Sequence, residues 1–439
     1  MTGERLVSVA DPTVRRATHV LELIFPPPRQ FGIRLWDGSE PPHETPAPFQ
    51  LVIHHPGALR RMFKPPVELS LGEAFIRDDF DIEGDIFSAY PLMEDIAKRQ
   101  FNMGDLVRLG LSLLSLPATP SKGMEGRGPL QARGEVHSRE RDRQVVQYHY
   151  DVGNDFYALW LDRNMQYSCG YFPTGAEDLD TAQELKMEHI CRKLRLSPGE
   201  RLLDIGCGWG GLARYAASKH GARVLGVTLS KNQKSYADGQ ASSKGLAKDV
   251  AVGLMDYRDL GDESFDKIVS VGMFEHVGRS HLPEYFAQVY RLLKPGGLFL
   301  NHGISRRAGT GSNEQGLVQK MIVGQDTFSQ RYIFPDGELE PVSDVNLIAE
   351  NAGFEVRDVE NLREHYALTL RNWVNRLAQH REEAIRASDP VTYRTWRLYM
   401  SGSAYGFESG NINVNQSLLA KTTPQGRSGV PLSRADLYQ

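Results

Sequence analysis

The stretch LLDIGCGWGG, residues 202–211, has the most informative spacing of chemically useful residues in the chain. Asp204, Gly206, Gly208 and Gly210 form the pattern D-x-G-x-G-x-G, and glycine lets a backbone approach a ligand closely. The pattern lacks the terminal Gly-Lys-Ser/Thr of a phosphate loop and the G-x-G-x-x-G spacing of a dinucleotide fingerprint. We therefore expect a cofactor with an amino-acid tail, whose ammonium group Asp204 holds. A close-packed strand-to-helix turn is the alternative.

This turn resembles that of S-adenosylmethionine-dependent methyltransferases. LMDYRDL places Asp256 after the third expected strand, where such enzymes bind adenine, and FDKIVSVGMFEHV has the form of their fourth-strand motif. The second strand departs from the pattern. Its end usually carries an acid for the ribose hydroxyls, whereas GVTLSKNQ offers Thr228, Leu229 and Gln233.

Longer motifs narrow the resemblance to one family. With GVTLSKNQ, the segments YHYDVGNDFYALWLDRNMQYSCGYF (148–172), LDIGCGWGG and SVGMFEHVG (270–278) resemble the cyclopropane fatty acid synthase family, over about residues 144–410. LGEAFIRDDFDIEGDI (71–86) also resembles the accessory domain of members that act on phospholipids, and the tail resembles that of actinobacterial relatives.

The resemblance implies methyl transfer from S-adenosylmethionine to the cis double bond of an unsaturated phospholipid acyl chain. An isolated alkene is a weak nucleophile, so rate must come from orientation in a dry pocket. The resulting carbocation must lose a proton, and in this family the base is bound bicarbonate. The family's bicarbonate positions fall on five residues: Cys169, Glu275, His302, Ile304 and Tyr366.

The same resemblance implies the cofactor contacts and the groups around the cation. Aromatic rings of Tyr167, Tyr171 and Phe274 are expected to stabilise the cation. This chain has glycine at position 303, where the family usually has threonine. The expected cofactor contacts are Tyr167, Ser168, Gly206, Gly208, Trp209, Gly210, Thr228, Leu229 and Gln233.

Each site residue also has a structural interpretation. Cys169 could fill space in a core, and His302 could be a core histidine bonded to the backbone. His276 is interpreted as structural, and the helical run that Tyr366 opens is interpreted as core.

The elements that must position these residues follow an α/β pattern. Short apolar runs suit strands buried on both faces, and the segments between them have helical spacing. Such alternation predicts a doubly wound, mostly parallel sheet with ligands at the carboxyl ends of its strands. The expected strands are RLLDIGC (201–207), ARVLGVT (222–228), VAVGLMD (250–256), FDKIVSVG (265–272) and LFLNHGI (298–304).

Composition divides the chain into three parts. Residues 1–116 form an α+β accessory unit with a strand-like run FQLVIHH at 49–55, residues 117–143 form a flexible linker, and residues 144–439 form the catalytic domain. The leucine-rich segment FNMGDLVRLGLSLLSLP is interpreted as an ordinary buried helix. An amphipathic helix that lies on the next domain or on lipid is the alternative.

The overall composition excludes several classes of protein. The net charge of −4 gives no case for nucleic acid, and three cysteines without metal-ligand spacing indicate neither a disulfide framework nor a metal site. No apolar run reaches the roughly 18 to 20 residues of a membrane span. We therefore expect a cytoplasmic enzyme, peripheral to the inner face of the cell membrane. The sequence leaves open whether it forms a homo-oligomer.

Two other functions stay open. Loss of a different proton would give a 10-methylene acyl chain, a precursor of 10-methyl-branched fatty acids, instead of a cyclopropane. From a different class, the protein could be a catalytically inactive lipid-binding protein.

Overall fold

The computed structural model describes residues 11–98, 102–118, 125–309 and 327–438. The chain forms two compact units. The first comprises residues 1–127, 312–331 and 389–402, and the second comprises the rest. The contiguous boundaries predicted above do not include the two later segments of the first unit, and residues 119–124 of the predicted linker lie outside the described residues.

The first unit is built on a three-stranded sheet in the order β1-β2-β3. β2 runs parallel to β1 and antiparallel to β3, so β2 is central. The expected strand FQLVIHH is β2. The elements of this unit's N-terminal part are α1 (Pro12–Ile24), β1 (Gly32–Arg34), β2 (Phe49–Ile53), α2 (Ala58–Met62), α3 (Val67–Ile76), β3 (Phe80–Gly84), α4 (Ala89–Lys98) and α5 (Met103–Leu114).

Residues 389–402 join this unit through buried arginines. They belong to α17 (Pro390–Glu408). The Arg394 guanidinium donates to the carbonyl oxygens of Phe75 and Phe80 at 2.6 and 2.7 Å and lies 4.3 Å from the Phe75 ring centroid. Arg397 donates to Asp81 at 2.9 Å. The Arg394 bonds satisfy a carbonyl group of α3, at Phe75, and one of β3, at Phe80, with a side chain from more than 300 positions along the chain.

Helix α5 is amphipathic, with its apolar stripe exposed. An Asn102–Asp105 capping box starts the helix, and Leu113 is its buried residue. Met103, Val107, Leu111 and Leu114, spaced on one side of the helix, are 54 to 68% exposed. The interpretation as an ordinary buried helix is therefore wrong.

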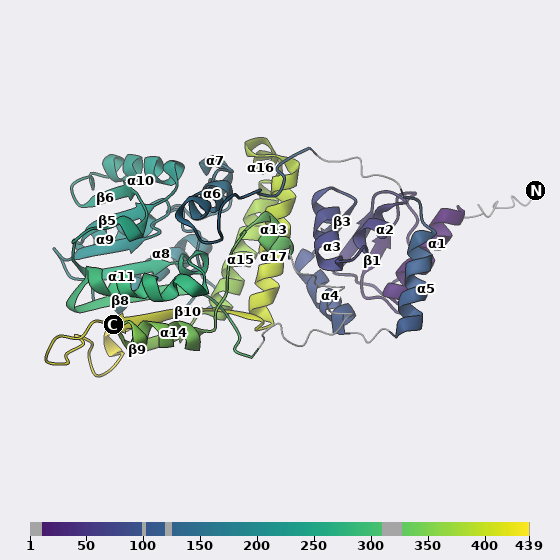
Figure 1. Cartoon of the computed structure of the whole chain (residues 1–439). Helices are drawn as coiled ribbons and strands as arrows, with labels where there is room; N and C mark the ends of the chain where they lie inside the picture. Colours follow the sequence, from purple (N-terminus) through teal and green to yellow (C-terminus); the bar gives the residue numbers. More distant parts are fainter. Residues whose placement is uncertain (1–10, 99–101, 119–124, 310–326, 439) are drawn as a thin grey trace, which may run out of the picture. The chain divides into compact units, whose positions relative to one another are not determined.

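The second unit contains a seven-stranded sheet in the order β6-β5-β4-β7-β8-β10-β9 (Figure 1). All five expected strands are present, and every pairing among them is parallel. The predicted doubly wound, mostly parallel fold is thus confirmed. The strands are β4 (Arg201–Ile205), β5 (Arg223–Thr228), β6 (Val250–Leu254), β7 (Phe265–Val271), β8 (Leu293–Arg306), β9 (Glu355–Asn361) and β10 (Ile412–Ala420).

Helices cover both faces of this sheet. Apolar side chains of α8 and α9 form one buried core with β4 and β5, and those of α11 and α14 form another with β7 and β8. Across the described residues, no helix has both the length and the apolar character that crossing a bilayer requires. The helices of this unit, besides the end of α17, are α6 (Arg139–Tyr150), α7 (Asn154–Ala158), α8 (Leu179–Lys193), α9 (Gly211–His220), α10 (Lys231–Ser243), α11 (Leu282–Leu292), α14 (Val342–Asn351), α15 (Arg363–Gln379) and α16 (Arg381–Ala387).

Strand β10 comes from the tail and runs antiparallel to both of its neighbours. It lies between β8 and β9, with Gln416 opposite His302 on one side and Glu360 on the other. This strand therefore brings the end of the chain to the strand that carries His302.

Candidate active site

The glycine turn connects β4 to α9 through left-handed backbone. Gly206, Gly208 and Gly210 have φ of 77°, 55° and 72°, which L side chains rarely adopt. A Cβ on Gly206 would also lie 3.1 Å from the Met273 side chain. The N–H groups of Gly206 and Cys207 both donate to the Val227 carbonyl at 3.0 Å, which fixes the turn against β5.

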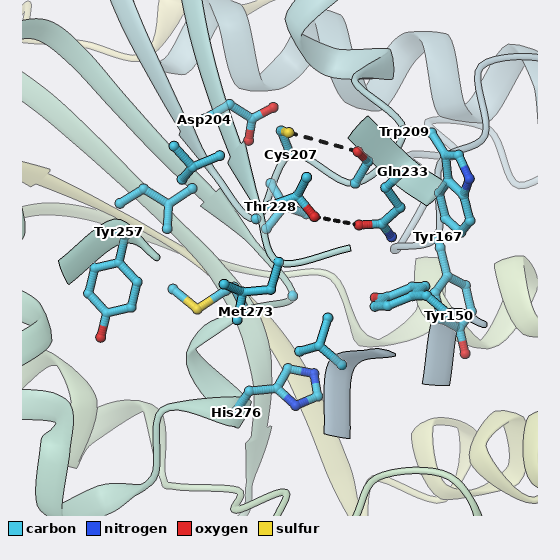
Figure 2. Close-up of a pocket in the computed structure, with 18 of the residues that line it drawn as sticks. Tyr150, Tyr167, Asp204, Cys207, Trp209, Thr228, Gln233, Tyr257, Met273 and His276 are labelled. Atoms are coloured by element: carbon cyan, nitrogen blue, oxygen red, sulfur yellow. Dashed lines mark hydrogen bonds between the residues drawn. The ribbon is translucent and has the colours of Figure 1, made fainter. Parts of the chain in front are cut away.

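A pocket opens at the carboxyl ends of β4, β5 and β7 (Figure 2). Gly210 is not among its lining residues. It starts α9, and a Cβ there would lie 3.0 Å from Ala237. The other expected cofactor residues all line the pocket: Tyr167, Ser168, Asp204, Gly206, Gly208, Trp209, Thr228, Leu229, Gln233 and Asp256. Their contact with the cofactor stays a prediction.

Asp204 gives the pocket an acidic group that lacks a partner. The side chain is buried, and among the described residues its Oδ2 atom has no hydrogen-bond partner. Burial raises the pKa of Asp204 to about 7, against the effect of the nearby Lys186 ammonium. A ligand ammonium beside this carboxylate would relieve that cost, so the residue fits the amino end of S-adenosylmethionine.

Lys186 of α8 is a buried residue that the sequence analysis missed. Its ammonium donates to the Gln166 and Ser168 side-chain oxygens, both at 2.7 Å. Burial lowers the pKa of Lys186 to about 8. Both acceptors line the pocket, so Lys186 fixes the pocket wall from behind. A lysine at helical spacing carries no sequence signal that separates it from a surface lysine.

Asp256 lines the pocket, but its carboxylate already has partners. Its two oxygens accept from the Arg258 side chain at 2.9 and 2.6 Å. Arg258 also donates to Asp142 of α6 at 2.8 Å. In its expected role at adenine, the Asp256 carboxylate would therefore have to bind the cofactor while it also accepts hydrogen bonds from Arg258.

The pocket side chains from β5 and α10 form a hydrogen bond with each other. The Thr228 hydroxyl donates to Gln233 Oε1 at 2.7 Å, and the indole N–H of Trp209 donates to Asn154 at the same distance. Figure 2 shows Trp209, Thr228 and Gln233 around the same opening as Tyr150 and Tyr167. The polar groups that replace the usual ribose acid are thus oriented by the protein itself.

His276 also lines the pocket, although the sequence analysis interpreted it as structural. Figure 2 places it beside Met273. Burial lowers the pKa of His276 to about 4, so the ring is neutral at physiological pH. Its place directly after Glu275 in the FEHVG motif was the available signal.

The expected bicarbonate residues come from four segments, because two of them lie on β8, and we call Cys169, Glu275, His302, Ile304 and Tyr366 the buried cluster. Cys169 and Tyr366 lie nearly two hundred positions apart in the sequence. All but Ile304 are buried, with exposed fractions of 9% or less.

Backbone bonds around Leu362 link the members of the buried cluster. The Leu362 carbonyl accepts from the Tyr366 N–H at 3.1 Å and from the Cys169 thiol at 3.7 Å. The Leu362 N–H donates to Val414, which is the cross-strand partner of Ile304. The fold therefore connects these segments at one end of the sheet.

Glu275 and Ile304 contact each other directly. Glu275 Oε1 accepts from the Ile304 N–H at 2.7 Å, so this backbone donor is occupied by the carboxyl group. Glu275 Oε2 is buried and has no partner among the described residues. Burial raises the pKa of Glu275 to about 7, against the effect of the Ile304 bond.

His302 and Cys169 are neutral at physiological pH. Burial lowers the pKa of His302 to about 3 and raises the pKa of the Cys169 thiol far above its usual range. The Tyr366 ring packs at 4.6 Å on Phe407. The Glu275 carboxyl group can thus hold or release a proton near pH 7, and none of the five residues is among those that line the cofactor pocket.

Comparisons with known proteins show the family to which the chain belongs. The family model described as mycolic acid cyclopropane synthetase matches residues 137–417. A probable fatty acid methyltransferase of Pseudomonas putida is 38% identical over 408 residues, which cover 93% of this chain and 96% of the relative. The chain belongs to the mycolic acid cyclopropane synthetase family. It is accordingly an S-adenosylmethionine-dependent methyltransferase.

Other members of the family resemble part of the chain. The cyclopropane-fatty-acyl-phospholipid synthase of Escherichia coli strain K12 is 41% identical over 292 residues, 66% of this chain and 71% of that protein. The solved structure of the mycolic acid cyclopropane synthase CmaA1, complexed with SAH and CTAB, matches with a TM-score of 0.59 at 34% identity. It covers 63% of this chain and 97% of that one.

Within this family, the glycine at position 303 has a structural explanation here. A Cβ on Gly303 would lie 1.9 Å from the Phe274 ring, so the ring occupies the space that a threonine side chain would take. Phe274 is not among the pocket-lining residues, and Tyr171 stacks on His189 and His365 with centroids 4.3 and 4.9 Å away. Of the three expected cation-stabilising rings, Tyr167 alone lines the pocket.

Proposed function

We propose that this enzyme methylates the cis double bond of an unsaturated phospholipid acyl chain and forms a cyclopropane ring. The observation that carries the proposal is the buried Glu275 carboxyl group, whose Oε2 atom has no partner in the described part of the chain. Met273 and His276, on either side of the Phe274–Glu275 step, line the cofactor pocket. A dry proton-handling group beside a methyl-donor pocket suits a reaction through a carbocation.

The bound cofactor supplies an electrophilic methyl group. The protein's own task is to hold the alkene against it and to exclude water, because water would quench the cation. The double-bond electrons form the new carbon–carbon bond, and a proton must then leave the new methyl group to close the ring. The raised pKa of Cys169 keeps its thiol protonated, so no thiolate is present there to trap the cation.

The residues of the buried cluster fit a bicarbonate ion, which would supply the base. A bicarbonate needs donors, and neutral His302, the Tyr366 hydroxyl and a protonated Glu275 can each donate. The pKa of Glu275, raised to about 7, keeps the carboxyl group partly protonated near neutral pH. Ile304 contributes by orienting Glu275, because its N–H is bonded to Oε1.

We also propose that the enzyme meets its substrate as a peripheral protein at the inner membrane surface. The exposed stripe of α5 supports this, because apolar side chains on one helix face bind to the headgroup boundary of a bilayer. Replacing Leu111 and Leu114 by glutamate should reduce flotation with phospholipid vesicles. The matched control is Leu432→Glu, at an exposed leucine in the other unit. Equal flotation of all three proteins would overturn this proposal.

Structural identification of the lipid product tests the reaction. The wild-type protein, expressed in a host that lacks the activity, should yield acyl chains with one added carbon and the proton NMR signals of a cyclopropane. Signals of an exocyclic methylene group would instead show that a different proton is lost. If no methylated chain forms and unsaturated vesicles give no cofactor turnover, the protein is an inactive lipid-binding member of its family.

A further inference from the structure

His302 is joined to a buried polar chain that lies outside the buried cluster. The register of β10 places Gln416 between His302 of β8 and Glu360 of β9. Gln416 Nε2 lies 3.0 Å from His302 Nδ1, and Gln416 Oε1 lies 2.8 Å from the Lys193 ammonium. Lys193 comes from the last turn of α8.

The partners of Lys193 keep it charged in the interior. Its ammonium lies 2.5 Å from Glu360 Oε2, and His189 lies 2.7 Å from the same oxygen. Although burial acts in the opposite direction, His189 and Lys193 lower the pKa of Glu360 to about 2. Lys193 is 1% exposed, so its charge is balanced by Glu360 and not by solvent.

Donor and acceptor accounting then fixes the direction of each bond. An ammonium group only donates, so Lys193 requires the oxygen of the Gln416 amide. The amide nitrogen of Gln416, which only donates, must therefore face His302 Nδ1. That ring nitrogen has to accept, and a neutral imidazole that accepts at Nδ1 carries its proton at Nε2.

We propose that Lys193 and Gln416 are positioning residues that lock His302 as the Nε2–H tautomer. The Nε2 nitrogen is then a permanent donor to an anion in the buried cluster. The part of this inference that concerns the anion rests on the proposed function. The tautomer itself follows from the protein alone. His302 accordingly holds the base and does not act as the base.

Long-range nitrogen–proton NMR of the full chain labelled at its histidine ring nitrogens tests the tautomer directly. The His302 signal is assigned by its absence from the His302→Gln spectrum. We expect a protonated Nε2 and an unprotonated Nδ1 in the wild-type protein without substrate. An Nδ1–H ring or an imidazolium would overturn the proposal, whatever the activity of the enzyme.

Gln416→Glu nearly keeps the size of the side chain but replaces the amide donor that faces His302 with an acceptor. A carboxylate there accepts from Lys193 and also from His302, so the ring proton should move to Nδ1. We expect kcat to fall roughly 10- to 100-fold, the range typical for outer-shell partners, while cofactor affinity stays unchanged. Retention of Nε2–H together with full turnover in this variant would contradict the proposal.

Asn415→Asp is the matched control, because it makes the same amide-to-acid change one residue away. Asn415 donates to the Ser305 hydroxyl at 2.7 Å and makes no recorded bond to His302 in the described structure. The ring pattern and kcat should stay near wild type. If Gln416→Glu does not fold, Lys193→Met replaces it. Loss of the ammonium frees the amide to turn, so mixed tautomers are expected, and an unchanged single Nε2–H pattern would count against the lock.

The two proposals fail separately. A wild-type protein with the Nε2–H pattern but no methylated lipid would retain the tautomer lock and remove the proposed function. A protein that makes the cyclopropane with an Nδ1–H ring would do the reverse.

Discussion

The cofactor pocket and the buried cluster are built in different ways. The pocket takes residues from two short stretches, 204–209 and 227–233, and its shape depends on glycine backbone at positive φ. The buried cluster draws its members from segments between Cys169 and Tyr366, and its character depends on side chains removed from water. The comparison teaches that mutations in these two regions should have different effects.

The largest expected effect is on the buried cluster. Glu275→Gln keeps the size of the side chain but cannot release a proton or carry charge. We expect kcat to fall about 10² to 10⁴-fold, as for loss of a positioned proton-transfer group. Affinity for S-adenosylhomocysteine, measured by calorimetry, should change little. Turnover near the wild-type rate would remove Glu275 from the mechanism and end the distinction between the two regions.

The pH dependence of stability gives a second test of the buried carboxyl group. The folded pKa of Glu275, about 7, lies above its ordinary value of 4.5, so the folded state binds the proton more tightly than the unfolded state. Stability from this group is therefore present below pH 4.5 and is lost as pH rises to about 7. The loss amounts to roughly 3 kcal/mol.

Denaturant unfolding of the wild type and Glu275→Gln at pH 5 and pH 8 measures this loss. The wild type should lose more stability than the variant between these two pH values. Asp204 has a similarly raised pKa and is present in both proteins, so its contribution cancels in the comparison. Parallel pH profiles would mean that Glu275 is not desolvated.

Gly303→Thr tests the packing at the border of the buried cluster. A Cβ at this position would lie 1.9 Å from the Phe274 ring, so the ring must move. We expect a loss of about 1 to 3 kcal/mol in the free energy of unfolding, as for other overpacked sites. Phe274→Leu should restore part of it in the double mutant. Additive losses in a double-mutant cycle would show that the two positions do not compete for space.

The smallest effect is expected in the pocket. Gly206→Ala strains a backbone at φ 77° and places a Cβ near Met273. We expect about a tenfold loss of cofactor affinity, equivalent to about 1.4 kcal/mol. The matched control is Gly175→Ala, which has φ 80° but open space around its Cβ and lies outside the pocket lining. It should cost stability without changing affinity, and equal affinity losses would indicate general strain.

The sequence predicts the glycine turn better than the polar chain behind His302 for a physical reason. The turn from Asp204 to Gly210 is local, so its spacing alone reports a ligand-binding backbone. The polar chain from His302 through Gln416 to Lys193 depends on the pairing of β10 with β8. Nothing in INVNQSLLA reveals whether that strand lies beside β8, and a shift of one residue would turn Gln416 to the other face.

The accessory unit shows the same limit. FQLVIHH predicts a strand by its apolar residues, and β2 forms there. The attachment of residues 389–402 through Arg394 depends on backbone carbonyl groups of Phe75 and Phe80, and these acceptors have no sequence signal. Such long-range hydrogen bonds to backbone groups can be identified only once the fold is known.

The most direct test of the account is to supply purified enzyme and S-adenosylmethionine with vesicles of cis-unsaturated or fully saturated phospholipid and to identify the products. With unsaturated vesicles, the account predicts methylated acyl chains and the release of one S-adenosylhomocysteine for each methyl group transferred. With saturated vesicles, it predicts neither product. Methyl transfer to a headgroup, or to saturated lipid, would contradict it.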